Sequence, residues 1–244
     1  QWLKIYDNQP IKSILADKYA VRKWVAEKIG DKYLIPLLGV WNSYEEIDFS
    51  LLPNNFVLKC THGSGMNIIV NDKSQLNHSE VKRKINQWMS VNYAYRSGFE
   101  MHYFDIVPKI IVEKYLESEN GEDLRDYKVF VFNGKVKLIQ VDIDRHHIHK
   151  RNLYTPEWEY VDCSILYPSA PNMIIEEPAC LKEMIALAEI LGEKFIHVRV
   201  DFYIWKGQIY FGEMTFTHGS GTEEFKPEEY ELVMGDWMEL QKGE

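Results

Sequence analysis

The sequence has few cysteines and no long apolar segment. Its three cysteines, Cys60, Cys163 and Cys180, lie far apart and form no CxxC pair, so they predict neither a disulfide framework nor a zinc motif. No apolar run approaches the roughly 20 residues that a membrane-spanning helix needs, and the first residues do not have the pattern of a signal peptide. These absences predict a cytoplasmic protein without a membrane span.

A basic excess is also absent. The net charge of −9 over 244 residues argues against a nucleic-acid partner, although it allows a local basic pocket. Apolar and charged contents of 45% and 27% are those of a soluble globular protein, and the length allows one large domain or two intimate ones. The chain starts with Gln1 rather than Met, which predicts that an N-terminal part of the full-length protein is missing.

Two strands joined by a tight turn are predicted in Val198–Gly221. Apolar and polar residues alternate along the first arm, and Lys206-Gly207 supplies the turn. Asp201 and Glu213 stand five and six residues from the turn, so a hairpin would bring both carboxylates to one end of a sheet, beside Arg199. Adjacent carboxylates repel unless a cation such as Mg²⁺, with bound phosphate, neutralises them. An ordinary hairpin with solvated acids is the equally open alternative.

A loop of small residues, Thr61–Gly65, separates the predicted strands Phe56–Lys59 and Asn67–Val70. Backbone N–H groups of such a loop can surround a phosphate, and Lys59 would add a point charge. The loop lacks the Walker A pattern, and a tight hairpin turn is the simpler alternative. The pentapeptide THGSG recurs at Thr217–Gly221. We interpret the two copies as ligand-binding loops facing one cleft, with chance recurrence left open.

Hydrophobic periodicity predicts the remaining elements. Helices are expected over residues 17–29, with Asp17 as the N-cap, and over 78–95, 179–191 and 227–240. A strand is expected over 108–116, a hairpin over 126–142 around Asn133-Gly134, and irregular structure over 158–178. The basic segment Arg145–Arg151 contains three histidines; an anion-binding or substrate-facing loop fits it better than a zinc site, because no helix or cysteine completes a ligand set.

The order of these motifs resembles the ATP-grasp superfamily. The motifs are Asp17-Lys18 before a helix, FVLK-x-THGSG, IVEKYL, DYKVFVFNGK and VRVDFY…FGEMTFTHGSG, and together they are most similar to the TupA-like branch, named for a teichuronopeptide biosynthesis protein. The resemblance runs from about Leu3 to about Leu240. It implies an α+β ATP-grasp fold in which two α+β subdomains clasp ATP between antiparallel sheets. Residues 1–244 would form one catalytic unit, with an N-terminal subdomain at about 45–115 and a C-terminal one at about 116–244.

The resemblance also implies a role for each matching residue. ATP phosphates would meet Lys59, Lys128 and the covering loop Gly63-Ser64-Gly65. Adenine would be read, largely through backbone groups, by the hinge strand Glu113, Lys114, Tyr115 and Leu116, and ribose would lie near Asp126, which is spaced further from the hinge than in better-known members. Mg²⁺ would be held by Asp201 and Glu213, with Thr215 where the family usually has Asn. The acyl phosphate would be steadied by Arg199, and the substrate would contact Arg145, Thr217, Gly219, Ser220 and Gly221.

The activity implied is ATP- and Mg²⁺-dependent ligation of a carboxylate to an amine through an acyl phosphate. The branch suggests an amino acid or amine joined to a uronic acid or acidic peptide during bacterial surface polysaccharide assembly. A kinase on the same fold and a degenerate nucleotide-binding scaffold are the alternatives; the Thr215 replacement keeps the scaffold open. A glycosyltransferase is a weaker alternative, because only Asp142-Ile143-Asp144 meets its metal motif.

Overall fold

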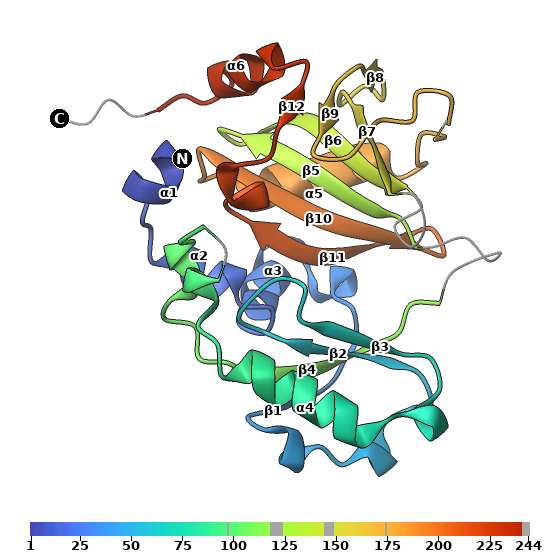
Figure 1. Ribbon diagram of the computed structural model, residues 1–244. Coiled ribbons are helices and arrows are strands. Elements are labelled where there is room, and N and C mark those ends of the chain that lie inside the picture. The colour runs from blue at the N-terminus through green and yellow to red at the C-terminus, as the bar shows by residue number, and fades with distance from the viewer. Residues whose placement is uncertain (97, 118–123, 144–148, 174, 241–244) are drawn as a thin grey trace. The chain divides into compact units, whose positions relative to one another are not determined.

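The computed structural model describes residues 1–96, 98–117, 124–143, 149–173 and 175–240, and they group into two compact units (Figure 1). Unit 1 comprises Gln1–Trp24 and Leu34–Glu117, and unit 2 comprises Val25–Tyr33 and Ser118–Glu244. Helix α3, Val21–Ile29, starts in unit 1 and ends in unit 2. Among the described residues, no helix is long and apolar enough to cross a membrane.

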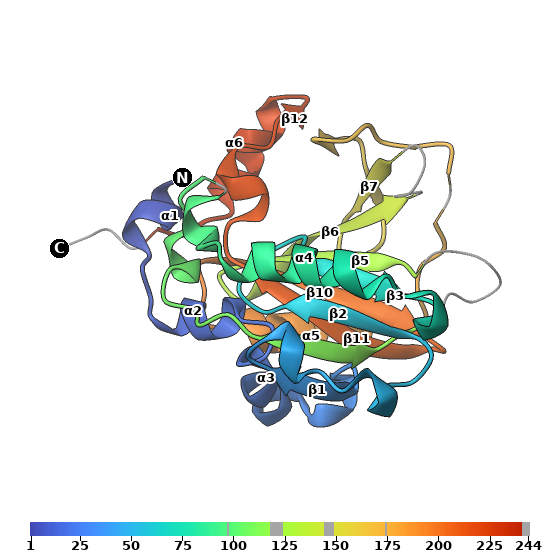
Figure 2. The same ribbon diagram turned by 60° about the horizontal axis from the view of Figure 1, so that its bottom comes forward.

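Unit 1 is built on a four-stranded antiparallel sheet in the order β1-β4-β2-β3. Its strands are β1 Leu37–Trp41, β2 Phe56–Cys60, β3 Asn67–Val70 and β4 Ile110–Lys114. Alternate residues of β2 are fully buried in the same apolar cluster as Val81 and Ile85 of helix α4, His78–Met89, which covers that face of the sheet (Figure 2). Because side chains alternate along a strand, Lys59 of β2 lies on the opposite face.

The predicted helix over 78–95 is wrong at its C-terminal end. Helix α4 stops at Met89, and a separate 3₁₀ turn, η5, covers Tyr93–Tyr95. The side chain of Asn92 accepts a hydrogen bond from the backbone N–H of Ala94, and such side-chain bonds compete with a continuous helix. Helix α3 starts at Val21, after a turn in which the Asp17 carboxylate accepts hydrogen bonds from the backbone N–H groups of Tyr19 and Ala20.

The other short helices of unit 1 carry connections. They are α1 Trp2–Tyr6, α2 Ile11–Ala16, η2 Tyr44–Glu46, η3 Phe49–Leu51, η4 Lys73–Gln75 and η6 Met101–Tyr103.

Unit 2 is built on a six-stranded antiparallel sheet in the order β11-β10-β5-β6-β7-β8. Its strands are β5 Asp126–Phe132, β6 Lys135–Ile143, β7 Lys150–Tyr154, β8 Tyr160–Val161, β10 His197–Trp205 and β11 Gln208–Thr215. Both predicted hairpins are confirmed, and their turn residues Asn133-Gly134 and Lys206-Gly207 have positive φ angles. The sheet therefore places β5 between β6 and β10, two strands that are far apart in the sequence.

The two faces of this sheet differ. Helix α5, Leu181–Gly192, packs against one face, where a Cβ on Gly192 would lie 2.5 Å from Val131 Cγ1. The other face is apolar at one end, in a cluster that includes Phe130, Phe132 and Leu153, and charged at the other end. The described residues of the segment 158–178, which was predicted to be irregular, include only the two-residue strands β8 and β9, Ser164–Ile165. The remaining elements are η1 Asp31–Tyr33, η7 His218–Gly221, β12 Phe225–Lys226 and α6 Glu229–Asp236.

Candidate active site

Strand register collects the charged residues of unit 2 on one face of the six-stranded sheet. One row crosses four neighbouring strands, because Glu213 pairs with Asp201, Asp201 with Lys128, and Lys128 with Gln140. Residues two positions apart along a strand share a face, so Asp126 stands next to this row on the same side. The predicted meeting of Asp201 and Glu213 at one end of a sheet is confirmed by their register.

Lys128 occupies the centre of the charged face. Its ammonium donates hydrogen bonds to Asp126 and to Asp201 Oδ2, the latter at 3.1 Å, and lies 3.9 Å from Asp142 Oδ2. Burial acts to lower the pKa of Lys128, but the carboxylates of Asp201 and Asp126 outweigh it and raise that pKa above the usual value. The lysine therefore remains charged, and the alternative of an outward, solvated side chain is excluded by its 6% exposure.

Arg199 binds Asp201 with a two-pronged contact. Its Nε donates to Asp201 Oδ1 at 2.7 Å and its Nη2 to Asp201 Oδ2 at 2.8 Å. The same Nη2 donates to Thr215 Oγ1 at 3.1 Å and approaches Glu213 Oε1 at 3.4 Å. Burial opposes the charge, yet these carboxylates raise the pKa of Arg199. Burial also raises the pKa of Asp201, against the opposing effect of Arg199 and Lys128. One guanidinium thus joins every residue that the resemblance placed at the metal.

The donor set at this position suits a hard cation in ligand type. Asp201 and Glu213 face each other across β10 and β11, and the Thr215 hydroxyl lies 3.3 Å from Glu213 Oε1. Oxygen ligands of this kind match Mg²⁺, which usually keeps several waters beside one or two carboxylates. No group of three His, Cys, Asp or Glu side chains within the described ranges is arranged to hold a metal. Mg²⁺ would therefore rely on two protein carboxylates, with Asp201 shared with Arg199.

A second ion-pair chain continues from this cluster and was not expected from the sequence. Arg151 Nε donates to Asp142 Oδ1 at 2.8 Å, and Arg151 Nη1 lies 3.7 Å from Glu223 Oε1. Glu223 Oε2 in turn lies 3.1 Å from His218 Nδ1 in the loop after β11. Arg151 was expected in a substrate-facing basic loop; instead it belongs to β7 and is buried. His149 of the same segment lies 3.4 Å from Asp142, whereas Arg145, His146, His147 and Asp144 lie outside the described residues.

In unit 1 the carboxylate of Glu113 joins two cations. Lys59 Nζ donates to Glu113 Oε2 at 2.6 Å, and Arg22 Nη1 donates to Glu113 Oε1 at 2.8 Å. Lys59 and Glu113 are diagonal neighbours on β2 and β4, because Lys59 pairs with Ile111. Arg22 could not be identified from the sequence, because it lies on helix α3, 91 residues before Glu113. Of the predicted hinge residues, Glu113 therefore holds Lys59 through its side chain, and Lys114 donates its backbone N–H to Pro36 O at 2.9 Å.

The two THGSG loops have different conformations. The first, Thr61–Gly65, links β2 to β3; Lys18 Nζ donates to Gly63 O at 2.9 Å, and a Cβ on Gly63 would lie 2.5 Å from the Tyr93 ring. The second forms η7, in which Gly219, Ser220 and Gly221 all have positive φ angles. The loops belong to different units, and their proposed common cleft stays a prediction.

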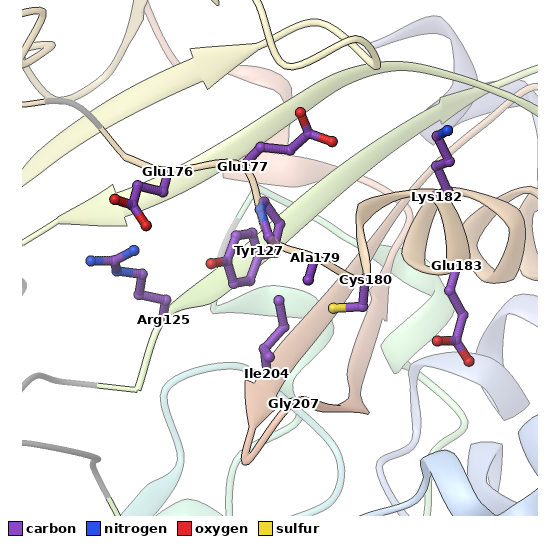
Figure 3. Close-up of a pocket in the computed structure, with 11 residues that line it drawn as sticks. Arg125, Tyr127, Glu176, Glu177, Ala179, Cys180, Lys182, Glu183, Ile204 and Gly207 are labelled. Carbon is purple, nitrogen blue, oxygen red and sulfur yellow. The ribbon is translucent and has the colours of Figure 1, made fainter.

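A pocket of about 640 Å³ lies on the other face of the unit 2 sheet (Figure 3). Tyr127 and Ile204 line it, and both alternate with residues of the charged face along β5 and β10. The remaining wall includes Arg125, Cys180 and Glu183. The pocket contains none of the site residues that the sequence indicated.

Comparison with known proteins gives one family and several solved structures. A family model described as TupA-like ATPgrasp matches residues 1–239. A D-alanine–D-alanine ligase from Bacillus anthracis complexed with ATP is 19% identical, with a TM-score of 0.50 over 83% of this chain and 55% of that chain. A second structure of that ligase is 19% identical, with a TM-score of 0.51 over 91% of this chain and 62% of that chain. An L-amino acid ligase from Bacillus licheniformis is 16% identical, with a TM-score of 0.49 over 85% of this chain and 44% of that chain.

This chain therefore spans less than two thirds of the length of the solved ligases that it resembles. No curated protein matches the sequence.

Proposed function

Because the chain belongs to the TupA-like ATP-grasp family, we propose that it is an ATP-dependent ligase that joins a carboxylate to an amine. The α+β ATP-grasp fold expected from the resemblance is confirmed. The activity is supported above all by one observation: Lys128, Arg199, Asp201 and Glu213 are gathered on one face of a sheet. Buried and semi-buried charges of both signs, held at fixed positions, are the means by which phosphoryl transfer is stabilised.

We assign roles in nucleotide binding to residues of unit 1 and to residues of unit 2. In unit 1, Lys59 and the loop Gly63-Ser64-Gly65 bind ATP phosphates, and the segment Glu113–Leu116 reads adenine. Glu113 acts there also as the residue that orients Lys59. In unit 2, Asp126 lies near the ribose and Lys128 binds phosphate. Asp201 and Glu213 hold Mg²⁺, with Thr215 beside them; when bound, the ion neutralises phosphate charge.

The proposed reaction has two steps. A substrate carboxylate oxygen attacks the γ-phosphorus of ATP, the bond to the β-phosphate oxygen breaks, and ADP leaves with an acyl phosphate formed. Arg199 steadies the charge of the acyl phosphate, and the loop Thr217–Gly221, with Arg145, positions the substrate. An amine then attacks the acyl carbon and displaces phosphate, giving an amide. No covalent protein nucleophile is required, because positioning and charge neutralisation carry both steps.

The proposed substrate class rests on the resemblance to the TupA-like branch alone. We propose an amino acid or amine as one substrate and a uronic acid or acidic peptide of a bacterial surface polysaccharide as the other. The chain spans only part of the length of the solved ligases, so the ligases' own substrates are not carried over to it.

The proposal is tested by ADP release from ATP and Mg²⁺ in the presence of paired acids and amines, with the product identified by mass spectrometry. A substrate carboxylate labelled with ¹⁸O should transfer one label to inorganic phosphate, because its oxygen becomes the bridging oxygen of the acyl phosphate. Asp201→Asn should abolish turnover, and Asp236→Asn on the exposed end of α6 is the matched control. ADP formed with a phosphorylated alcohol and no amide would identify a kinase and refute ligation.

A further inference from the structure

The ion-pair chain from Lys128 ends at the loop that the proposed function assigns to the substrate. Asp142 lies between Lys128 and Arg151, and its side chain is 0% exposed. Arg151 lies between Asp142 and Glu223. Glu223 holds His218, the second residue of the THGSG loop. These side chains thus form a continuous polar path from a buried strand to that loop.

Arg151 is held too firmly to serve as a ligand for a small molecule. Its guanidinium donates from Nε to Asp142 and from Nη1 to Ile165 O, at 2.8 Å and 3.0 Å, and lies 5.0 Å from the centre of the Tyr167 ring. The side chain is only 7% exposed. A planar guanidinium fixed at several points holds its remaining partner in a defined direction. For Arg151 that partner is Glu223.

Glu223 in turn clamps a loop with an unusual backbone. Gly219, Ser220 and Gly221 have φ angles of 52°, 54° and 68°, and Ser220 is a non-glycine residue in the left-handed region, which needs support from its surroundings. The Glu223 side chain supplies contact on two sides. It binds His218, and it lies so close to Gly219 that a Cβ there would be 2.0 Å from Glu223 Cγ.

We infer that Arg151 is a positioning residue of the proposed ligase: it fixes Glu223, and through Glu223 it sets the backbone of the loop 217–222. This inference rests on the proposed function for the role of the loop, but not for the loop's geometry. Asp142 serves to hold Arg151 in place. The buried Asp142–Arg151 pair therefore has two roles: each charge balances the other, and Arg151 positions Glu223. Removing both charges together separates these roles.

The test uses the whole chain labelled with ¹⁵N-glycine, whose 14 glycines give a simple amide spectrum. The variants are Arg151→Met, Arg151→Lys and the double variant Asp142→Asn/Arg151→Met, with Arg83→Met on the exposed face of α4 as the control. Thermal unfolding is measured on each. Arg151→Met should lower the melting temperature, because Asp142 loses its closest cation, and should move the amide signals of Gly219 and Gly221.

The double variant decides between the two roles. It should regain most of the lost melting temperature, since neither buried charge remains, while the Gly219 and Gly221 signals stay displaced, since Glu223 still lacks its anchor. Arg151→Lys should give an intermediate displacement. Signals that return to their wild-type positions in the double variant, or that do not move in Arg151→Met, would overturn the inference.

ATP binding by the wild type is measured separately by calorimetry with ATP and Mg²⁺. Absence of binding would count against the proposed function, while the glycine signals still decide the inference about Arg151.

Discussion

Replacing Lys128 with Met should destabilise unit 2 strongly at neutral pH. The substitution removes the ammonium that contacts Asp126 and Asp201 and lies 3.9 Å from Asp142. Arg199 still binds Asp201, and Arg151 still binds Asp142, so Asp126 is the carboxylate that loses most. Removing one partner of a buried ion pair lowers the free energy of unfolding by about 3–5 kcal/mol. Because the two arginines still neutralise Asp201 and Asp142, we expect a loss near the lower value, about 3 kcal/mol.

This loss should become smaller as the pH falls. Burial already raises the pKa of Asp201 in the wild type, against Arg199 and Lys128, and the loss of Lys128 removes one of the two cations that oppose this rise. A carboxyl with a raised folded-state pKa stabilises the fold when it is protonated, and that contribution disappears as the pH rises through the raised pKa. In the wild type, by contrast, the raised pKa of Lys128 means that its contribution is complete below the unfolded-state pKa of lysine and is lost only in alkali.

Calorimetric unfolding at pH 7 and pH 5 measures both effects. A loss of about 3 kcal/mol corresponds to a melting temperature about 6–12 °C lower for a chain of this size, and the gap from the wild type should narrow at pH 5. Lys137→Met, on an exposed position of β6, is the matched control. If Lys128→Met and Lys137→Met had the same melting temperature at both pH values, the idea that Lys128 holds the acidic cluster together would be refuted.

Three further predictions concern unit 1. Gly63→Ala should lower the free energy of unfolding by about 1–3 kcal/mol, because its Cβ would meet the Tyr93 ring at 2.5 Å. Gly235→Ala in helix α6, where nothing lies within 4 Å of the added Cβ, is the control and should cause no loss; equal melting temperatures would contradict this. Burial raises the pKa of the Cys60 thiol to about 12, so Ellman's reagent at pH 8 should label Cys60 only after denaturation, and rapid labelling of the native protein would be the contrary result. Burial lowers the pKa of His102 to about 4, so stability should fall by about 3 kcal/mol between pH 6.5 and pH 4 as the unfolded state takes up a proton; a His102 NMR titration midpoint near 6.5 would rule this out.

The sequence could predict the hairpin that carries the acids because the information is local. Alternation along β10 and the Lys206-Gly207 turn bring Asp201 and Glu213 to the same end of the hairpin. Their direct pairing also needs the register shift between Asp201 and Phe202, because an unshifted hairpin would place Asp201 opposite Gly212. The same local reasoning gave the loops after β2 and β11. The same reasoning predicted too long a helix from His78. The Asn92 side chain caps a separate turn after the helix, and hydrophobic periodicity alone does not show where such a helix ends.

The charged face could not be predicted in full because it depends on strand order. Lys128 is buried because β10 pairs with β5 across some 70 residues of sequence, and a single lysine in a strand looks the same whether its neighbours are solvent or carboxylates. Neither the Asp142-Ile143-Asp144 motif nor the basic segment that ends at Arg151 indicates a link to Glu223. Only the register of β6 with β7 and the path of the loop after β11 bring these residues together.

The most direct test of the account is calorimetric unfolding of the chain with and without ATP and Mg²⁺. Nucleotide at 100 times its dissociation constant stabilises a folded protein by about 2.7 kcal/mol, which should raise the melting temperature by about 5–10 °C. We expect this rise for the wild type and the Asp236→Asn control, and its loss in Asp201→Asn and Glu213→Gln. A wild type whose melting temperature is unchanged by millimolar ATP and Mg²⁺ would contradict the nucleotide site on which the proposed ligase activity depends.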